Sequence, residues 1–265
     1  MDDRYIGALL LIPLIVFLFL GGEYLKYASM VISLLGTYEY YKVAKVKNFH
    51  PIEIVGYLIV IIYYFYLGLA FNFNILSIII ILSTIVMLSI PVINTKYTYV
   101  DCAVTLLGFI YITVFSGFIY LINIKQYGSR FVWLVFISSW ATDITAYYIG
   151  KNFGKKKLCP KVSPKKTVAG SIGGFLGSVI FCSISGYIFI LSKIPIKFIN
   201  YILMGAISGI TCQFGDLAAS SIKRYSGVKD YSHLIPGHGG ILDRFDSILF
   251  SSVTIYLYIT LILHL

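Results

Sequence analysis

The chain alternates long apolar segments with short polar ones along its whole length. A helix needs about 20 apolar residues to cross the hydrocarbon core of a bilayer. Segments of about that length recur with polar loops between them, so the pattern predicts about nine transmembrane helices. The predicted segments are 5–20, 24–41, 52–71, 75–93, 99–122, 131–149, 171–191, 198–221 and 247–265.

The composition agrees with this pattern. Hydrophobic residues make up 58% of the 265 residues and charged residues 12%, whereas a soluble domain is about half apolar and about a quarter charged. The chain has too few polar groups to cover a soluble surface, and its 17% aromatic residues exclude a disordered chain. The sequence therefore predicts an all-α polytopic membrane protein.

The formal charge is +10, from 21 Lys and Arg against 11 Asp and Glu. Lys and Arg accumulate in loops on the cytoplasmic side of a membrane. With the N-terminus inside, 16 of the 21 fall in inner loops and 5 on the outer side. We therefore predict a cytoplasmic N-terminus and an outer C-terminus, and we attribute the positive charge to topology rather than to nucleic-acid binding.

The character of the chain changes along its length. The first four apolar segments carry almost nothing ionisable at mid-membrane depth, whereas long basic loops, paired glycines and acids follow from residue 131 onward. We predict N-terminal scaffold helices over 1–96 and a catalytic transmembrane domain over 97–265. The cytoplasmic loops of the catalytic domain are 150–170 and 222–246.

Four acids lie within or at the ends of the later apolar segments, where ionisable groups are costly and mark functional sites. At 1.5 Å per residue, Asp143 and Asp216 each lie about 10 Å before the cytoplasmic end of their helix. Asp243 and Asp246 open the last helix from the same side. Three helices should therefore bring carboxylates to one layer below the cytoplasmic surface. For Asp246, a first-turn acid that complements the helix dipole is an equally good interpretation.

Clustered carboxylates at this depth favour a metal ion, and Mg²⁺ prefers one or two carboxylates together with water and substrate phosphates. Lysines and hydroxyls before a glycine-rich helix start are elements that hold phosphate. The run 163–167 has this form, so we predict phosphate contacts from Ser163, Lys165, Lys166 and Thr167. In the second loop, His238 stands among glycines, between clusters of Lys and Arg. We predict that it also contacts phosphate, and the alternative is that it caps a turn.

The second loop carries a recognisable signature. Residues 220–246 read Ser-Ser-Ile-Lys-Arg, then Lys229-Asp230, then Pro-Gly-His-Gly-Gly, then Asp-Arg-Phe-Asp. This stretch resembles, without a gap, the signature of the phosphatidate cytidylyltransferases (CDP-diacylglycerol synthases). Upstream, 143–147 resembles the D-T-G-A-Y element of that family, and 151–170 resembles its F-G-K-x-K-L-x-P-x-x-S-P-K-K-T segment. The resemblance is close over 131–250 and only topological over the first hundred residues.

The resemblance implies a nucleotidyltransferase that converts CTP and phosphatidic acid into CDP-diacylglycerol and pyrophosphate with Mg²⁺. It implies that Asp216 and Asp243 hold Mg²⁺, with Asp143 and Asp246 either supporting them or binding another cation. It also implies a bacterial cytoplasmic (inner) membrane, a membrane-lipid substrate and no nucleic-acid partner; a homodimer is left open. The basic residues expected to neutralise the substrates and the leaving group are Lys165, Lys166, Lys223, Arg224, Lys229 and Arg244.

Three positions depart from the family pattern. Thr145 stands where glycine is common. Ala169 and Ala219 stand where family members often carry glutamate. If either glutamate helps to hold a second cation, that second site is weakened in this chain.

Two other classes of function stay open. Lipid specificity is not legible in an apolar groove, so another CTP-dependent enzyme, of the polyprenol kinase or archaeal CDP-lipid synthase type, is an alternative. A cation-coupled transporter would also carry intramembrane acids. It fits less well, because the acids cluster at one shallow depth and no inverted repeat is visible.

Overall fold

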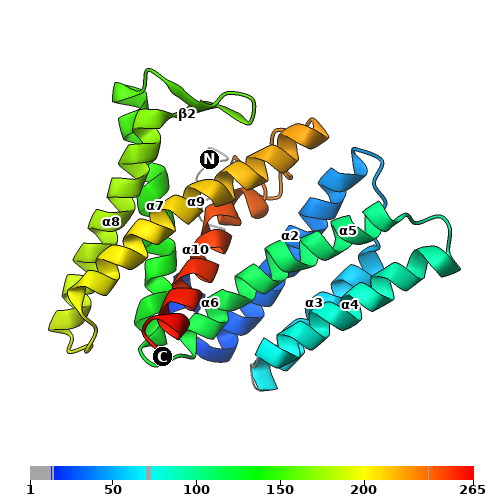
Figure 1. The fold of residues 1–265 in the computed structure, drawn as a ribbon, viewed down its shortest axis with the longest axis horizontal. Helices are drawn as coiled ribbons and strands as arrows, with labels where there is room; N and C mark the ends of the chain where they lie inside the picture. The colour runs from blue at the N-terminus through cyan, green and yellow to red at the C-terminus, as the bar shows by residue number, and fades with distance from the viewer. Residues whose placement is uncertain (1–12, 14, 70–72, 238) are drawn as a thin grey trace. The chain divides into compact units, whose positions relative to one another are not determined.

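The computed structural model describes residues 13, 15–69, 73–237 and 239–265. The predicted segment 5–20 falls mostly outside this part of the chain, and His238 falls outside it altogether. The regular elements of the described residues are helices apart from one short hairpin, and irregular loops connect them (Figure 1). The elements are α2 (Gly22–Lys45), α3 (Glu53–Leu69), α4 (Phe73–Ile93), α5 (Tyr99–Gly108), the π-helix η1 (Phe109–Val114), α6 (Phe115–Asn123), α7 (Gly128–Phe153), β1 (Lys157–Cys159), β2 (Ser163–Thr167), α8 (Val168–Leu191), α9 (Phe198–Ser226) and α10 (Leu242–Leu261).

The predicted helical class is confirmed, and each predicted segment from the second onward contains a helix. Within the described residues, four helices are long and apolar enough to cross a membrane, and a shorter apolar helix covers Glu53–Leu67. Large exposed apolar side chains along α4 and α8 are what lipid contact requires. The four long helices are Asn74–Ile93, Tyr99–Asn123, Val168–Leu191 and Phe198–Ser226.

The chain forms two compact units. The first unit comprises Met1–Leu121 and Ser226–Asp243, and the second comprises Ile122–Tyr225 and Arg244–Leu265. The first unit thus contains most of the second basic loop as well as the N-terminal helices. The assignment of scaffold and catalytic roles on either side of residue 96 stays a prediction.

In the first unit, buried polar side chains join helices that are far apart in sequence. Tyr64 on α3 shares hydrogen bonds of 2.9 Å with Ser33 on α2 and with Ser116 on α6. All three residues are buried. Buried hydroxyls need such partners, because leaving one unpaired costs about 1–3 kcal/mol. The cluster fixes the contact between the three helices.

In the second unit, α7 and α8 pack closely because α8 presents glycines to its neighbour. A Cβ at Gly174 would lie 3.0 Å from the backbone oxygen of Thr142 on α7 and 3.1 Å from the Cβ of Ala146. Before α8, the chain forms an antiparallel hairpin in which Lys157 pairs with Thr167 and Cys159 with Ser163. The apolar pattern did not predict this hairpin, because its strands are short and rich in lysine.

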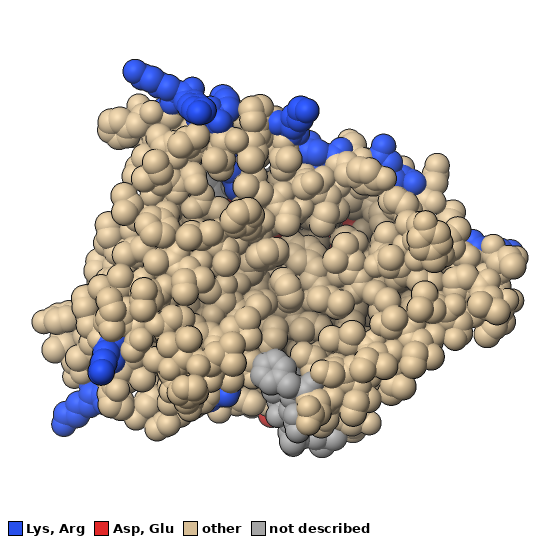
Figure 2. Space-filling view, in the orientation of Figure 1, with Lys and Arg blue, Asp and Glu red and all other residues tan. Residues whose placement is uncertain are grey.

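Positive charge in the second unit lies at the helix ends and in the connections between helices. Exposed lysines occupy the hairpin, and Lys193 and Lys197 lie in the connection between α8 and α9. On the face shown in Figure 2, the surface of α8 and α9 between these two ends carries almost no Lys or Arg. This distribution is typical of helices that cross an apolar layer.

We predict that Gly174→Val lowers the stability of the protein. The added methyl groups would press against the α7 backbone, and overpacking of this kind costs about 1–3 kcal/mol. The midpoint of thermal unfolding, measured on purified protein in detergent, should therefore fall. Leu176→Val is the matched control, since it places valine on the exposed face of the same helix. Equal midpoints for the two variants would contradict close packing at Gly174.

Candidate functional site

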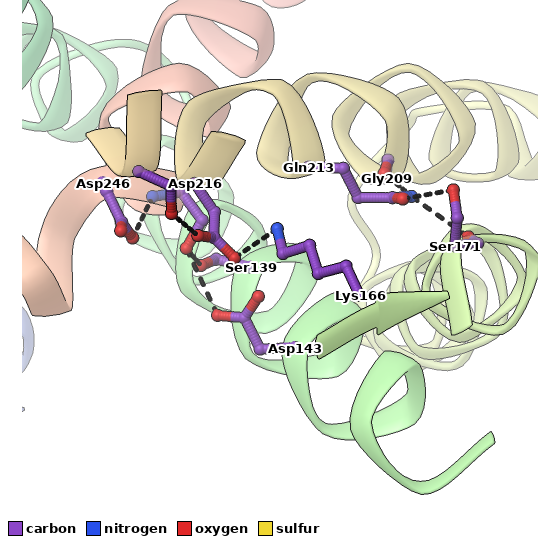
Figure 3. Close-up of polar contacts among 10 residues, drawn as sticks. Ser139, Asp143, Lys166, Ser171, Gly209, Gln213, Asp216 and Asp246 are labelled. Atoms are coloured by element: carbon purple, nitrogen blue, oxygen red, sulfur yellow. Dashed lines mark hydrogen bonds and ion pairs between the residues drawn. The ribbon is translucent and has the colours of Figure 1, made fainter. Parts of the chain in front are cut away.

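Three carboxylates from three helices face one region of the second unit. They are Asp143 on α7, Asp216 on α9 and Asp246 on α10 (Figure 3). Each is close enough to the other two to interact electrostatically. Asp143 is exposed, Asp216 is half-buried and Asp246 is buried. The structure therefore brings together three of the four acids that the sequence singles out.

Two serines that the sequence pattern did not indicate connect two of these acids, Asp143 and Asp246. The hydroxyl of Ser247 donates to Oδ2 of Asp143 at 3.3 Å and shares a 2.7 Å hydrogen bond with the hydroxyl of Ser139. The backbone N–H of Ser247 donates to Oδ1 of Asp246 at 2.7 Å. Ser139 lies one helical turn before Asp143, and Ser247 follows Asp246 directly. Spacing on α7 could have indicated Ser139, but only the fold shows that Ser247 meets it.

Lys166 provides the positive charge nearest to Asp216. Its Nζ forms an ion pair with Oδ2 of Asp216, while the hydroxyl of Ser220 donates to Oδ1 at 3.3 Å. Lys166 reaches this position from β2 (Figure 3). Because successive side chains of a strand point to opposite faces, Lys165 points away from Lys166, and it is exposed.

The other predicted phosphate contacts of the first loop have different positions. The Thr167 hydroxyl accepts a hydrogen bond from the backbone N–H of Gly170 at 3.1 Å and so caps the start of α8. Ser163 lies at the opposite end of β2, in register with Cys159. Thr167 therefore has a structural role at the helix start, and substrate contacts by both residues stay predictions.

Further positive charges lie near the acids in the second unit. Lys223, in the last turn of α9, is buried and interacts electrostatically with Asp246. Arg244 is exposed and interacts electrostatically with Asp143. Arg224 follows Lys223 and is exposed. Cations thus accompany the acids, as a site for phosphorylated substrates requires.

Gln213 connects α9, which carries Asp216, to the start of α8, which follows the strand that carries Lys166. Its Nε2 donates to the backbone oxygens of Ser171 at 3.1 Å and Gly209 at 2.8 Å, and its Oε1 accepts from the Ser171 hydroxyl (Figure 3). Gln213 lies one turn before Asp216 on α9, and Ser171 lies in the first turn of α8. This second connection was not predicted, because it depends on the register between two helices.

Asp243 belongs to the first unit and holds the second loop. Its Oδ2 accepts hydrogen bonds from the backbone N–H groups of Tyr231 and Gly240, both at 2.9 Å. Lys229 of this loop is exposed. The described contacts of Asp243 are therefore those of an acid that shapes a loop, and its predicted role as a metal ligand stays a prediction.

The acids of the second unit differ from a metal site that is built from protein ligands alone. Within the described residues, no group of three or more His, Cys, Asp or Glu side chains is arranged to hold a metal ion. Mg²⁺ does not require such a group, because one or two carboxylates, water and substrate phosphates satisfy it. Asp143 and Asp216 supply carboxylate oxygens that are accessible to water. These acids fit a Mg²⁺ ion that is shared with a bound phosphate.

Comparisons with known proteins agree with the sequence signature. The sequence model of the cytidylyltransferase family matches residues 2–262. A protein of Bacillus subtilis (strain 168) is 37% identical over 170 residues, which are 64% of this chain and 62% of the relative. A protein of Aquifex aeolicus (strain VF5) is 42% identical over 139 residues, 52% of this chain and 51% of the relative.

A third relative, from Staphylococcus aureus (strain COL), is 38% identical over 159 residues, 59% of this chain and 58% of the relative. All three relatives carry the name phosphatidate cytidylyltransferase. The matched regions thus span between half and two thirds of each relative's length. The family match, by contrast, includes both basic loops and every helix that contributes an acid to the site. The chain belongs to the cytidylyltransferase family.

Proposed function

We propose that this chain transfers CMP from CTP to phosphatidic acid and releases pyrophosphate, giving CDP-diacylglycerol for phospholipid biosynthesis. Family membership and the names of the three relatives support this reaction. The observation that carries the proposal is the group of Asp143, Asp216 and Asp246 with Lys166 at its edge. Acids and cations in one place suit a reaction between two phosphorylated substrates.

The chemistry requires positioning more than acid–base catalysis. A phosphate oxygen of phosphatidic acid would attack the α-phosphorus of CTP, and the bond between the α-phosphorus and the bridging oxygen would break to release pyrophosphate. The attacking oxygen is already ionised at neutral pH, so no strong general base is needed. The barrier lies in bringing two polyanions together and in stabilising the leaving group, and fixed cations lower both terms.

The residues of the second unit can perform these tasks. Lys166, Lys223 and Arg244 would neutralise phosphate oxygens, and the exposed Lys165 and Arg224 would attract the nucleotide from water. Asp216 and Asp143 would hold Mg²⁺, which supplies further charge neutralisation when it is bound. Ser247 and Ser139 would keep the carboxylate of Asp143 in a fixed orientation.

We also propose nine transmembrane helices, with a cytoplasmic N-terminus and an outer C-terminus, in a bacterial cytoplasmic membrane. Four sufficiently long apolar helices and the excess of lysine at the hairpin end of the second unit support this topology. The arrangement suits the substrates, because CTP arrives from the cytoplasm and the lipid from the bilayer.

The purified protein should form lipid-linked CMP from labelled CTP and phosphatidic acid, and it should need Mg²⁺ to do so. Parallel reactions test the neighbouring enzyme classes. An archaeal-type lipid phosphate is supplied with CTP labelled at the α-phosphate, which CMP transfer attaches to the lipid. A polyprenol is supplied with CTP labelled at the γ-phosphate, which a kinase transfers with release of CDP. If one of those lipids is labelled and phosphatidic acid is not, that lipid is the substrate instead. Ion transport across vesicle membranes, without formation of any lipid-linked product, would contradict the proposed enzymatic function.

We expect Asp216→Asn to lower kcat about 10²- to 10³-fold, because it removes a charge that stabilises the bound cation. The measurement is turnover at saturating Mg²⁺, with expression checked by the yield of folded protein. Glu23→Gln makes the same chemical change in an acid that is ion-paired with Lys26 in the first unit, and it should leave turnover unchanged. Near-normal turnover of Asp216→Asn would remove this residue from the site.

The sequence assigns Asp243 the same role, so Asp243→Asn should also nearly abolish turnover. An asparagine amide in place of Oδ2 could not accept the hydrogen bonds from Tyr231 and Gly240. Raising the Mg²⁺ concentration distinguishes the two roles: a lost metal ligand is partly compensated by excess metal, whereas a distorted loop is not. Full activity at ordinary Mg²⁺ concentrations would contradict both roles.

Lysines 165 and 166 should differ in effect, since only Lys166 reaches Asp216. A charge-assisted hydrogen bond contributes about 1.5–3 kcal/mol, so Lys166→Ala should raise the KM for CTP about tenfold or more. Lys165→Ala, with its exposed side chain, should change the KM less. Normal KM and rate in the double variant would mean that both lysines serve only membrane topology.

A further inference from the structure

Glu39 is a buried acid in α2, in a region where the sequence pattern indicated almost nothing ionisable. Only 1% of the surface of Glu39 is exposed to solvent. Acids are almost never so buried unless they are paired. Its carboxylate accepts hydrogen bonds from the Ser232 hydroxyl (2.5 Å) and the Ile241 N–H (2.9 Å) on Oε1, and from the Leu242 N–H (2.8 Å) on Oε2. All three donors belong to one segment of the first unit, the second basic loop and the start of α10.

The two backbone donors explain why an acid is suited to this position. Leu242 is the first residue of α10, and Ile241 precedes it. The first N–H groups of a helix have no partner within the helix. A carboxylate there satisfies them and interacts favourably with the positive end of the helix dipole. Glu39 therefore caps α10 from a different helix.

Gly240 shows how closely the carboxylate fits. A Cβ at this position would lie 2.6 Å from both Oε1 and Oε2 of Glu39, which is closer than non-bonded atoms approach. Asp243 holds the same loop through the N–H groups of Tyr231 and Gly240. Two carboxylates, one from α2 and one from α10, thus fix the described residues of segment 231–242.

We propose that Glu39 is a positioning residue: it sets the conformation of residues 231–237 and 239–242 and the start of α10, and through them the orientation of Asp243. Its effect on turnover rests on the proposed function, because Asp243 and this loop belong to the signature of the CMP-transfer enzymes. A buried carboxylate pays a desolvation cost that an apolar side chain would avoid. Its three directed hydrogen bonds provide what an apolar side chain lacks, a unique loop geometry.

The kinetic test is Glu39→Gln. The amide keeps one acceptor oxygen, but in either orientation its NH₂ group would face a backbone N–H, that of Ile241 or that of Leu242. Misplacement of a catalytic group by about 1 Å costs about 10²-fold in rate. We therefore expect kcat to fall by about that factor, while the KM for CTP changes by less than about threefold, since Glu39 does not touch substrate. Glu53→Gln, in an acid of α3 that is paired with Lys45 at 2.6 Å, should behave like the unchanged protein.

A second readout does not depend on turnover. Hydrogen exchange of the full-length protein in detergent reports on the amides of segment 231–242. In Glu39→Gln, and in Gly240→Ala, which displaces the carboxylate by crowding, these amides should exchange faster, while α3 and α5 keep their exchange rates. Ser232→Ala removes one of the three bonds and should give a smaller change of the same kind, so it serves if Glu39→Gln does not fold.

Normal kcat in Glu39→Gln, or unchanged exchange in segment 231–242, would overturn the proposal. Faster exchange throughout α2, α3 and α5 would also overturn it, because it would show a general contribution to stability instead. If the unchanged protein forms no lipid-linked CMP, the proposed function fails, but the exchange pattern still decides whether Glu39 holds this segment.

Discussion

A carboxylate placed among apolar helices must find donors or cations within the protein, because the bilayer core provides no water to solvate it. This chain meets the requirement in three ways. Asp216 has a cation, Lys166; Asp143 has a hydroxyl, that of Ser247; and Glu39 has backbone N–H groups. The three kinds of partner differ in what they permit. A lysine side chain can be exchanged for another cation, whereas a helix N-terminus cannot move away from its cap without distorting the helix.

The exchangeable partner lies on a short hairpin rather than on a transmembrane helix. Lys166 belongs to a hairpin of two short strands, joined to α8 by the cap that Thr167 provides. Gly174 lets α8 approach α7, and Gln213 connects α8 to α9 near Asp216. The helices thus hold the acids at fixed positions while a flexible lysine stem supplies the charge. The proposed CMP transfer would use this combination, since its cations would have to change partners as phosphates bind and leave.

The sequence predicts features that depend on neighbouring residues in the chain better than contacts between residues that are far apart in it. Hydropathy located the described helices, because a segment that crosses a bilayer must be apolar along its whole length. Counting along the helices also placed Asp143, Asp216 and Asp246 at a similar depth, and the structure brings them together. The partners of these acids were not predictable, because Ser139 meets Ser247 only through the packing and register of α7 and α10.

Glu39 shows the same limit more clearly. Segment 24–41 is apolar overall and contains one acid, Glu39. The hydrogen-bond donors to Glu39 lie in residues 232–242, about 200 residues later in the chain. Thr167 shows how a structural role can be overlooked. A hydroxyl beside lysines suggests a phosphate contact, but the first N–H groups of α8 need a cap. Thr167 supplies this cap. In both cases an unsatisfied helix N-terminus determines the contact. Since every helix has such an end, polar residues near a predicted helix start are best considered first as caps and then as ligands.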